Sequence, residues 1–108
     1  MTRSAEATAP HPWLTEQIDD LLGAIVALRD RERARSFFRD LCTIGELEAM
    51  ARRWEVVRLV DAGEAYLEIS KRTGASTATV TRVAHWLHHG EGGYAAALHK
   101  RGARASTT

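Results

Sequence analysis

The sequence is poor in the residues that interrupt helices, cross-link chains or anchor them in lipid. Its 108 residues include one cysteine, Cys42, and two prolines, neither of them beyond residue 12. A single cysteine excludes an intrachain disulfide. Because no proline occurs after residue 12, none can interrupt a helix there. No apolar run approaches the ~20 residues that cross a bilayer, and no signal peptide is apparent. We therefore expect a cytoplasmic, helix-rich protein with no membrane partner.

The sequence also lacks the arrangements that enzymes and metal sites use. No carboxylate pair and no nucleophile with an adjacent base stands out, so we do not expect an enzyme. His85, His88 and His89 occupy helical positions i, i+3 and i+4, but no paired cysteine or H-E-x-x-H string accompanies them. The segment Gly90-Glu-Gly-Gly93 follows a predicted helix and is not followed by the lysine and serine of a phosphate-binding loop, so we do not expect it to bind phosphate. We expect neither a metal nor a resident cofactor.

Charge is distributed unevenly along the chain. Residues 1–63 hold nine Lys and Arg against eleven Asp and Glu, whereas residues 64–108 hold six against three. The formal charge of the whole chain is only +1 at pH 7. The basic second part is a modest indication of a polyanionic partner.

Apolar residues recur at helical spacing after residue 12, and no segment alternates as a half-buried strand does. The spacing predicts helices over 13–28, 31–42, 43–62, 65–71, 76–88 and 94–101. Thr43 with Glu46 forms a capping-box pattern, and Gly63 suits the left-handed conformation that ends a helix. Small and polar residues predict a disordered arm over 1–12 and a flexible tail over 102–108, which leaves one domain over 13–101.

The first three predicted helices carry much apolar surface for a small chain without sheets. Leu14, Ile18 and Leu21 share one face of the first helix, and Phe37 and Phe38 mark the second. This favours a homodimer in which N-terminal helices pack between two chains, with a monomeric bundle as the alternative.

Residues 65–88 have the spacing of a helix-turn-helix. Ile69 is the expected inward residue of its first helix. Gly74 follows Ser70 by four positions, where the turn requires a positive φ. Three apolar residues then hold the second helix against the core: Ala75, Val80 and Val83.

With those residues inward, Thr77, Ala78 and Thr81 lie on the outward face of the second helix. From that face, side chains can reach base edges in a major groove of double-stranded DNA. Threonine offers a hydroxyl that donates or accepts and a methyl that can contact thymine. The plainer alternative is that these residues merely cap and cover a surface helix.

Other residues near the turn suit the DNA backbone. Ser76, at the helix start with its free N–H groups, is a candidate phosphate contact. Lys71 and Arg72 adjoin the same unit and are further candidates. Arg82 lies on or near the same outward side and is a further candidate DNA contact.

Several of these motifs occur together between residues 46 and 94. They are Leu47-Glu48-Ala49, Arg52-Arg53, Gly63, Ile69, Thr73-Gly74, Ser76-Thr77-Ala78-Thr79-Val80-Thr81-Arg82 and Gly90-Glu-Gly-Gly-Tyr94. In this combination the chain resembles the Trp-repressor superfamily, and most closely its YerC/YecD branch. The resemblance implies an all-α, intertwined homodimer whose helix-turn-helix units bind a palindromic operator, usually to repress transcription.

The resemblance also raises the question of a small-molecule effector, since the superfamily's namesake binds L-tryptophan. The two arginines that face that ligand match Arg53 and Arg82. Where the namesake has a glycine and a serine beside the ligand, this chain has Val83 and Trp86. Both replacements add bulk, so L-tryptophan is disfavoured, and a different effector or ligand-free binding stays open. The remaining alternative is a protein-interaction or architectural module that uses this fold without sequence-specific DNA binding.

Overall fold

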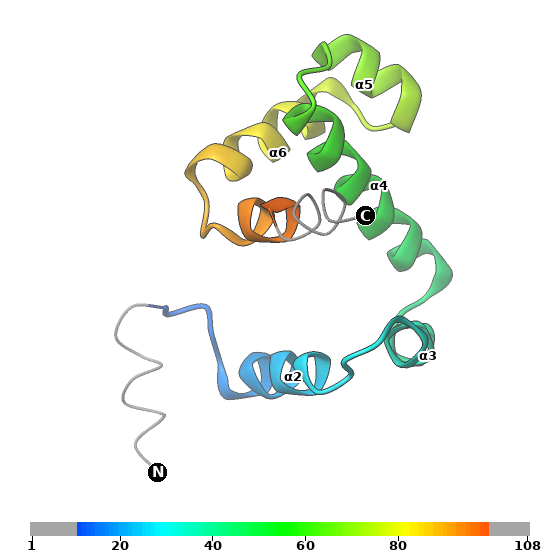
Figure 1. Ribbon diagram of the computed structural model, residues 1–108, viewed down its shortest axis with the longest axis vertical. Helices are drawn as coiled ribbons and strands as arrows, with labels where there is room; N and C mark the ends of the chain where they lie inside the picture. The colour runs from blue at the N-terminus through cyan, green and yellow to red at the C-terminus, as the bar shows by residue number, and fades with distance from the viewer. Residues whose placement is uncertain (1–10, 100–108) are drawn as a thin grey trace. The chain divides into compact units, whose positions relative to one another are not determined.

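The computed structural model describes residues 11–99, which form helices joined by turns, with no strand in that range (Figure 1). The helices are α2 (Glu16–Val26), α3 (Arg31–Leu41), α4 (Ile44–Asp61), α5 (Tyr66–Thr73) and α6 (Thr77–His89). Residues 93–99 are also helical. The all-α class predicted from the periodicity is confirmed.

The chain divides into two compact units, Met1–Thr43 and Ile44–Thr108. The predicted arm falls largely on residues 1–10, and the predicted tail on 102–108, both outside the described residues. The assignment of 13–101 to one domain stays a prediction. None of the helices between residues 11 and 99 combines the length and the apolar character that a membrane crossing requires.

Side-chain caps set where the two helices of the first unit begin. The Thr15 hydroxyl accepts a hydrogen bond from the Ile18 backbone N–H at 3.2 Å, so α2 begins at Glu16. The apolar spacing had placed this start at residue 13, but Trp13 lies in the preceding turn. The Asp30 carboxylate caps α3 in the same way, accepting from Arg33 N–H at 2.8 Å.

Several apolar residues of the first unit are exposed. Neither α2 nor α3 contains a buried residue. Leu21, Leu22 and Leu41 are exposed, and 78% of the Val26 surface is accessible. Leu21, Leu22 and Val26 lie close together in sequence on α2, and neighbouring exposed apolar residues are typical of an interaction surface.

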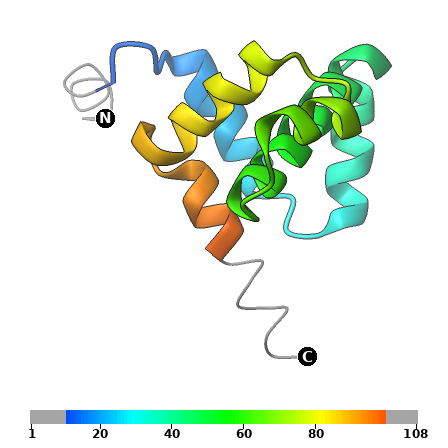
Figure 2. The same ribbon diagram turned by 90° about the horizontal axis from the view of Figure 1, so that it is seen from above.

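The core lies in the second unit, between α4, α5 and α6. Its fully buried side chains are Ile69, Val56, Val57 and Val80. The helical residues 93–99, orange in Figures 1 and 2, add Tyr94 and Leu98 to this core.

The buried part of α4 is wider than a single apolar stripe. Val56, Val57 and Leu59 are all buried, although adjacent residues of a helix point about 100° apart. The reason is that α4 contacts both α5 and α6 and also borders residues 93–99, so more than one of its sides is covered. Met50, near its start, is 40% exposed.

Candidate nucleic-acid interface

The turn between α5 and α6 is built from a glycine and two hydroxyl side chains. Gly74 has φ 81°, as the spacing predicted, and its N–H donates to the Ser70 carbonyl at 2.9 Å. The Ser70 hydroxyl donates to the Ala75 carbonyl at 2.6 Å. The Thr73 hydroxyl donates to the Ile69 carbonyl at 2.7 Å and accepts from the Ala75 N–H at 3.1 Å. These bonds give partners to the Gly74 and Ala75 N–H groups and to the Ala75 carbonyl, and they fix how α6 leaves α5.

The roles of the Ser70 and Thr73 hydroxyls in the turn were not predicted from the sequence. A serine and a threonine just before a turn glycine could have indicated these bonds, because their hydroxyls bond to nearby backbone groups.

The inward face of the helix-turn-helix is confirmed. Ile69 and Val80 are fully buried, and Val83 and Ala75 are nearly so. These side chains pack with residues of α4 in one cluster. Because they fix the rotation of α6 about its axis, they also decide which residues of α6 face outward.

Ser76 is the N-cap of α6, as predicted. Its hydroxyl accepts from the Thr79 N–H at 3.1 Å and donates to the Thr79 hydroxyl at 3.0 Å. The side chain of Ser76 is therefore engaged within the helix. Its suitability for a phosphate rests on the backbone N–H groups of the first turn.

The three candidate base-reading residues, Thr77, Ala78 and Thr81, are all exposed on α6. Thr79, between them in sequence, is half-buried and so lies nearer to the side of α6 that packs on the core. The Thr81 hydroxyl donates to the Thr77 carbonyl at 3.0 Å, one turn earlier.

The candidate phosphate contacts of α5 are exposed and only loosely paired. Lys71 Nζ lies 3.8 Å from a Glu68 carboxylate oxygen. Arg72 Nη1 lies 3.6 Å from a carboxylate oxygen of Glu64. Exposed pairs at such distances contribute little to stability, so both cations can turn to a phosphate at small cost.

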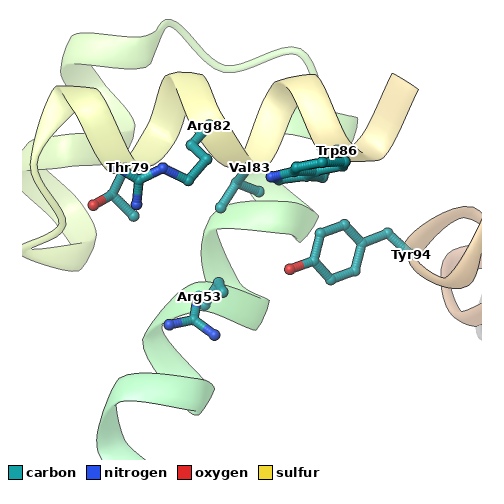
Figure 3. A pocket seen from close by; sticks show the side chains of 6 residues that line it. All are labelled: Arg53, Thr79, Arg82, Val83, Trp86 and Tyr94. Atoms are coloured by element: carbon teal, nitrogen blue, oxygen red, sulfur yellow. The ribbon is translucent and has the colours of Figure 1, made fainter. Parts of the chain in front are cut away.

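A cavity of about 260 Å³ lies beside α6 (Figure 3). It is lined by Thr79, Arg82, Val83 and Trp86 of α6, by Arg53 of α4, and by Tyr94 of the helical residues 93–99. The structure thus brings together Arg53 and Arg82, the two candidate ligand contacts.

Trp86, one of the two aromatic residues that line this cavity, is partly exposed to solvent. Val83 is buried, whereas Trp86 is 52% exposed and also lines a second, more open hollow with Gly90 and Tyr94. Sequence reasoning singled out Val83 and Trp86 as bulky residues at a ligand position, and both do line the cavity. It did not identify Tyr94 as a lining residue, since that side chain comes from a separate helical segment.

The histidines of α6 lie close to one another near its end. The ring centroids of His85 and His89 are 5.1 Å apart, and those of His88 and His89 are 6.4 Å apart. Among residues 11–99, no group of three or more His, Cys, Asp or Glu is placed to hold a metal ion.

Comparisons with known proteins agree with this geometry. The family model "Trp repressor protein" matches residues 16–102. YerC of Bacillus subtilis (strain 168), an uncharacterized protein, is 43% identical over 83 residues, which are 77% of this chain and 80% of YerC.

Two solved structures have similar folds. A TrpR-like protein from Eubacterium eligens ATCC 27750 is 39% identical, with a TM-score of 0.76 over 82% of this chain and 91% of that one. A candidate Trp repressor from Staphylococcus aureus is 35% identical, with a TM-score of 0.75 over 82% and 88%. The chain therefore belongs to the Trp repressor family of helix-turn-helix regulators, in its YerC-like branch.

Proposed function

We propose that the protein is a sequence-specific DNA-binding transcriptional regulator, and a repressor that acts by occupying its operator. The observation that carries this proposal is the outward face of α6, where Thr77, Ala78 and Thr81 are exposed while Val80 and Val83 are buried. A helix held in this way can enter a major groove with its N-terminal half against the base edges. The role involves no catalysis.

The DNA backbone is contacted from both sides of the turn. Lys71 and Arg72 lie in the last turn of α5, and the N–H groups after Ser76 open α6. Phosphate contacts at these positions set the position of α6 along the duplex without reading sequence. Arg82 is exposed and lies beside the cavity, so it serves either the backbone or an effector.

The proposed regulator is a homodimer. This is supported by α2 and α3, which have no buried residue and leave Leu21, Leu22 and Val26 exposed. A second copy of the chain would cover these residues, and its two-fold symmetry requires a palindromic operator. The half-sites would lie about 34 Å apart, one turn of the double helix.

We propose further that L-tryptophan is not the effector. Val83 and Trp86 line the cavity at positions where the superfamily's namesake leaves room for the ligand. Any effector would bind through Arg53 and Arg82, and operator binding without a ligand is the simplest expectation. We place the proposed regulator in the cytoplasm, together with the DNA that it binds.

The proposal is tested by selecting binding sites for the full chain from a pool of randomised DNA duplexes. We expect enrichment of one sequence with two-fold symmetry. The same selection with Thr77 and Thr81 both changed to alanine should lose the enriched sequence while keeping non-specific binding. Binding without an enriched palindrome at moderate salt would overturn the proposal and favour an architectural or protein-interaction module.

A further inference from the structure

The hydrogen-bonding state of the Thr81 side chain limits what it can recognise. Its hydroxyl donates to the Thr77 carbonyl at 3.0 Å, and a carbonyl oxygen can only accept, so the direction of this bond is fixed. The single hydroxyl proton is therefore used within α6. Towards solvent, and towards a bound duplex, the Thr81 oxygen offers only lone pairs.

The other two threonines of α6 differ from Thr81. The Thr79 side chain is half-buried and bonded to Ser76, so it does not face the groove. The Thr77 hydroxyl is exposed and has no hydrogen-bond partner in the part of the chain that the structure describes. It can rotate to donate or to accept, and so it adapts to any base edge.

Base edges in the major groove differ in what they offer to an acceptor. Adenine presents its N6 amino group and cytosine its N4 amino group, and both are donors. Guanine presents O6 and N7, and thymine presents O4, so these two bases offer only acceptors there. An acceptor-only hydroxyl therefore favours adenine or cytosine on the contacted strand and disfavours guanine or thymine.

We infer that Thr81 is a specificity-determining residue that makes one position of each half-site selective for adenine or cytosine, the two bases that present an exocyclic amino group in the major groove. Thr77, one turn earlier on the same face, contacts a position with little selectivity. The inference rests on the proposed function, because it needs α6 to lie in the major groove. It goes further by stating which chemical group of the base is read and by which atom.

The experiment measures affinity for the selected operator with each of the four base pairs placed in turn at every half-site position. Wild-type protein should prefer adenine or cytosine over guanine and thymine at one position by about tenfold, the effect of one good hydrogen bond. Thr81→Val, which replaces the hydroxyl by a methyl of similar shape, should remove that preference. Thr81→Ser keeps the hydroxyl and should retain it. Thr77→Val is the matched control and should lower affinity evenly.

A modified base separates direct reading from an indirect effect. Where adenine is preferred, we replace it by purine deoxyriboside, which lacks the amino group; where cytosine is preferred, by 2-pyrimidinone deoxyriboside. The wild-type protein should lose about tenfold in affinity and Thr81→Val should lose nothing further. Thermal unfolding of each variant confirms that it is folded.

Three results would overturn the inference while leaving the proposed function intact. The first is a Thr81-dependent preference for guanine or thymine, and the second is a base preference that is unchanged in Thr81→Val. The third is a loss of affinity from the modified base that adds in full to the loss from Thr81→Val. A selection that enriches no sequence at all would instead refute the proposed function, and the inference with it.

Discussion

Replacing Gly74 by alanine should weaken the fold, although the added methyl group has room. Gly74 has φ 81°, in the left-handed region, and a Cβ built there would meet only Arg52 Nε, at 3.9 Å. The cost is therefore conformational and not steric. For a residue with a Cβ it amounts to about 1–2 kcal/mol.

A glycine on α2 gives a matched control for this substitution. Gly23 lies within α2, has no neighbour within 4 Å of a built Cβ and has no positive φ. It follows Ile18 by five residues, about 140° around the helix from that apolar residue. Gly23→Ala should therefore stabilise the protein by about 0.5–1 kcal/mol, because alanine has the higher helix propensity.

Urea unfolding followed by circular dichroism measures both changes. The two variants carry the same chemical change and should shift the free energy of unfolding in opposite directions. In a domain of this size, 1 kcal/mol corresponds to a Tm change of about 4–8 °C. A Gly74→Ala variant as stable as the wild type would refute the account of the turn.

Three further predictions follow from single residues. Gly90→Ala should weaken the packing of the helical residues 93–99, because a Cβ at position 90 would lie 2.5 Å from the Trp86 carbonyl oxygen. The measurement is tryptophan fluorescence, and a spectrum identical to that of the wild type would contradict the prediction. Lys71→Ala should reduce the slope of log affinity against log salt by about 0.9, the effect of one phosphate contact. Arg35→Ala is the matched control. Arg35 is as exposed as Lys71 and is likewise paired with a glutamate three residues away, but its loss should leave the salt slope unchanged. Equal slopes for the two variants would contradict a phosphate contact by Lys71. Arg29→Gly should raise the free energy of unfolding by about 1 kcal/mol, because Arg29 holds φ 71°; a loss of stability would show that its side chain outweighs this strain.

The sequence predicted the local backbone features of the helix-turn-helix. The glycine turn at Gly74, the N-cap at Ser76 and the rotation of α6 each depend on residues a few positions apart. Glycine at a position of positive φ and serine at a helix start are requirements of the backbone itself. For this reason, the inward and outward faces of α6 could be assigned before the fold was known.

Features that depend on distant segments, on side-chain rotamers or on which residue caps a helix were harder to predict. Leu59 is buried because α4 is covered on more than one side, which no single apolar stripe shows. Tyr94 reaches the cavity from a separate helical segment. The bond from Thr81 to the Thr77 carbonyl depends on a side-chain rotamer, and spacing carries no information about rotamers. The start of α2 was misplaced because apolar spacing continued past the cap at Thr15.

The most direct test of the central claim is to change the spacing of the two half-sites in the selected operator. Two α6 helices of a symmetric dimer reach successive major grooves on one side of the duplex, about 10 base pairs apart. Inserting 5 base pairs at the centre turns the second half-site to the opposite side. We predict that affinity then falls to that of a duplex carrying one half-site, and that inserting about 10 base pairs lowers it less. Equal affinity for all three spacings would contradict the proposal that paired helix-turn-helix units bind DNA as a homodimer.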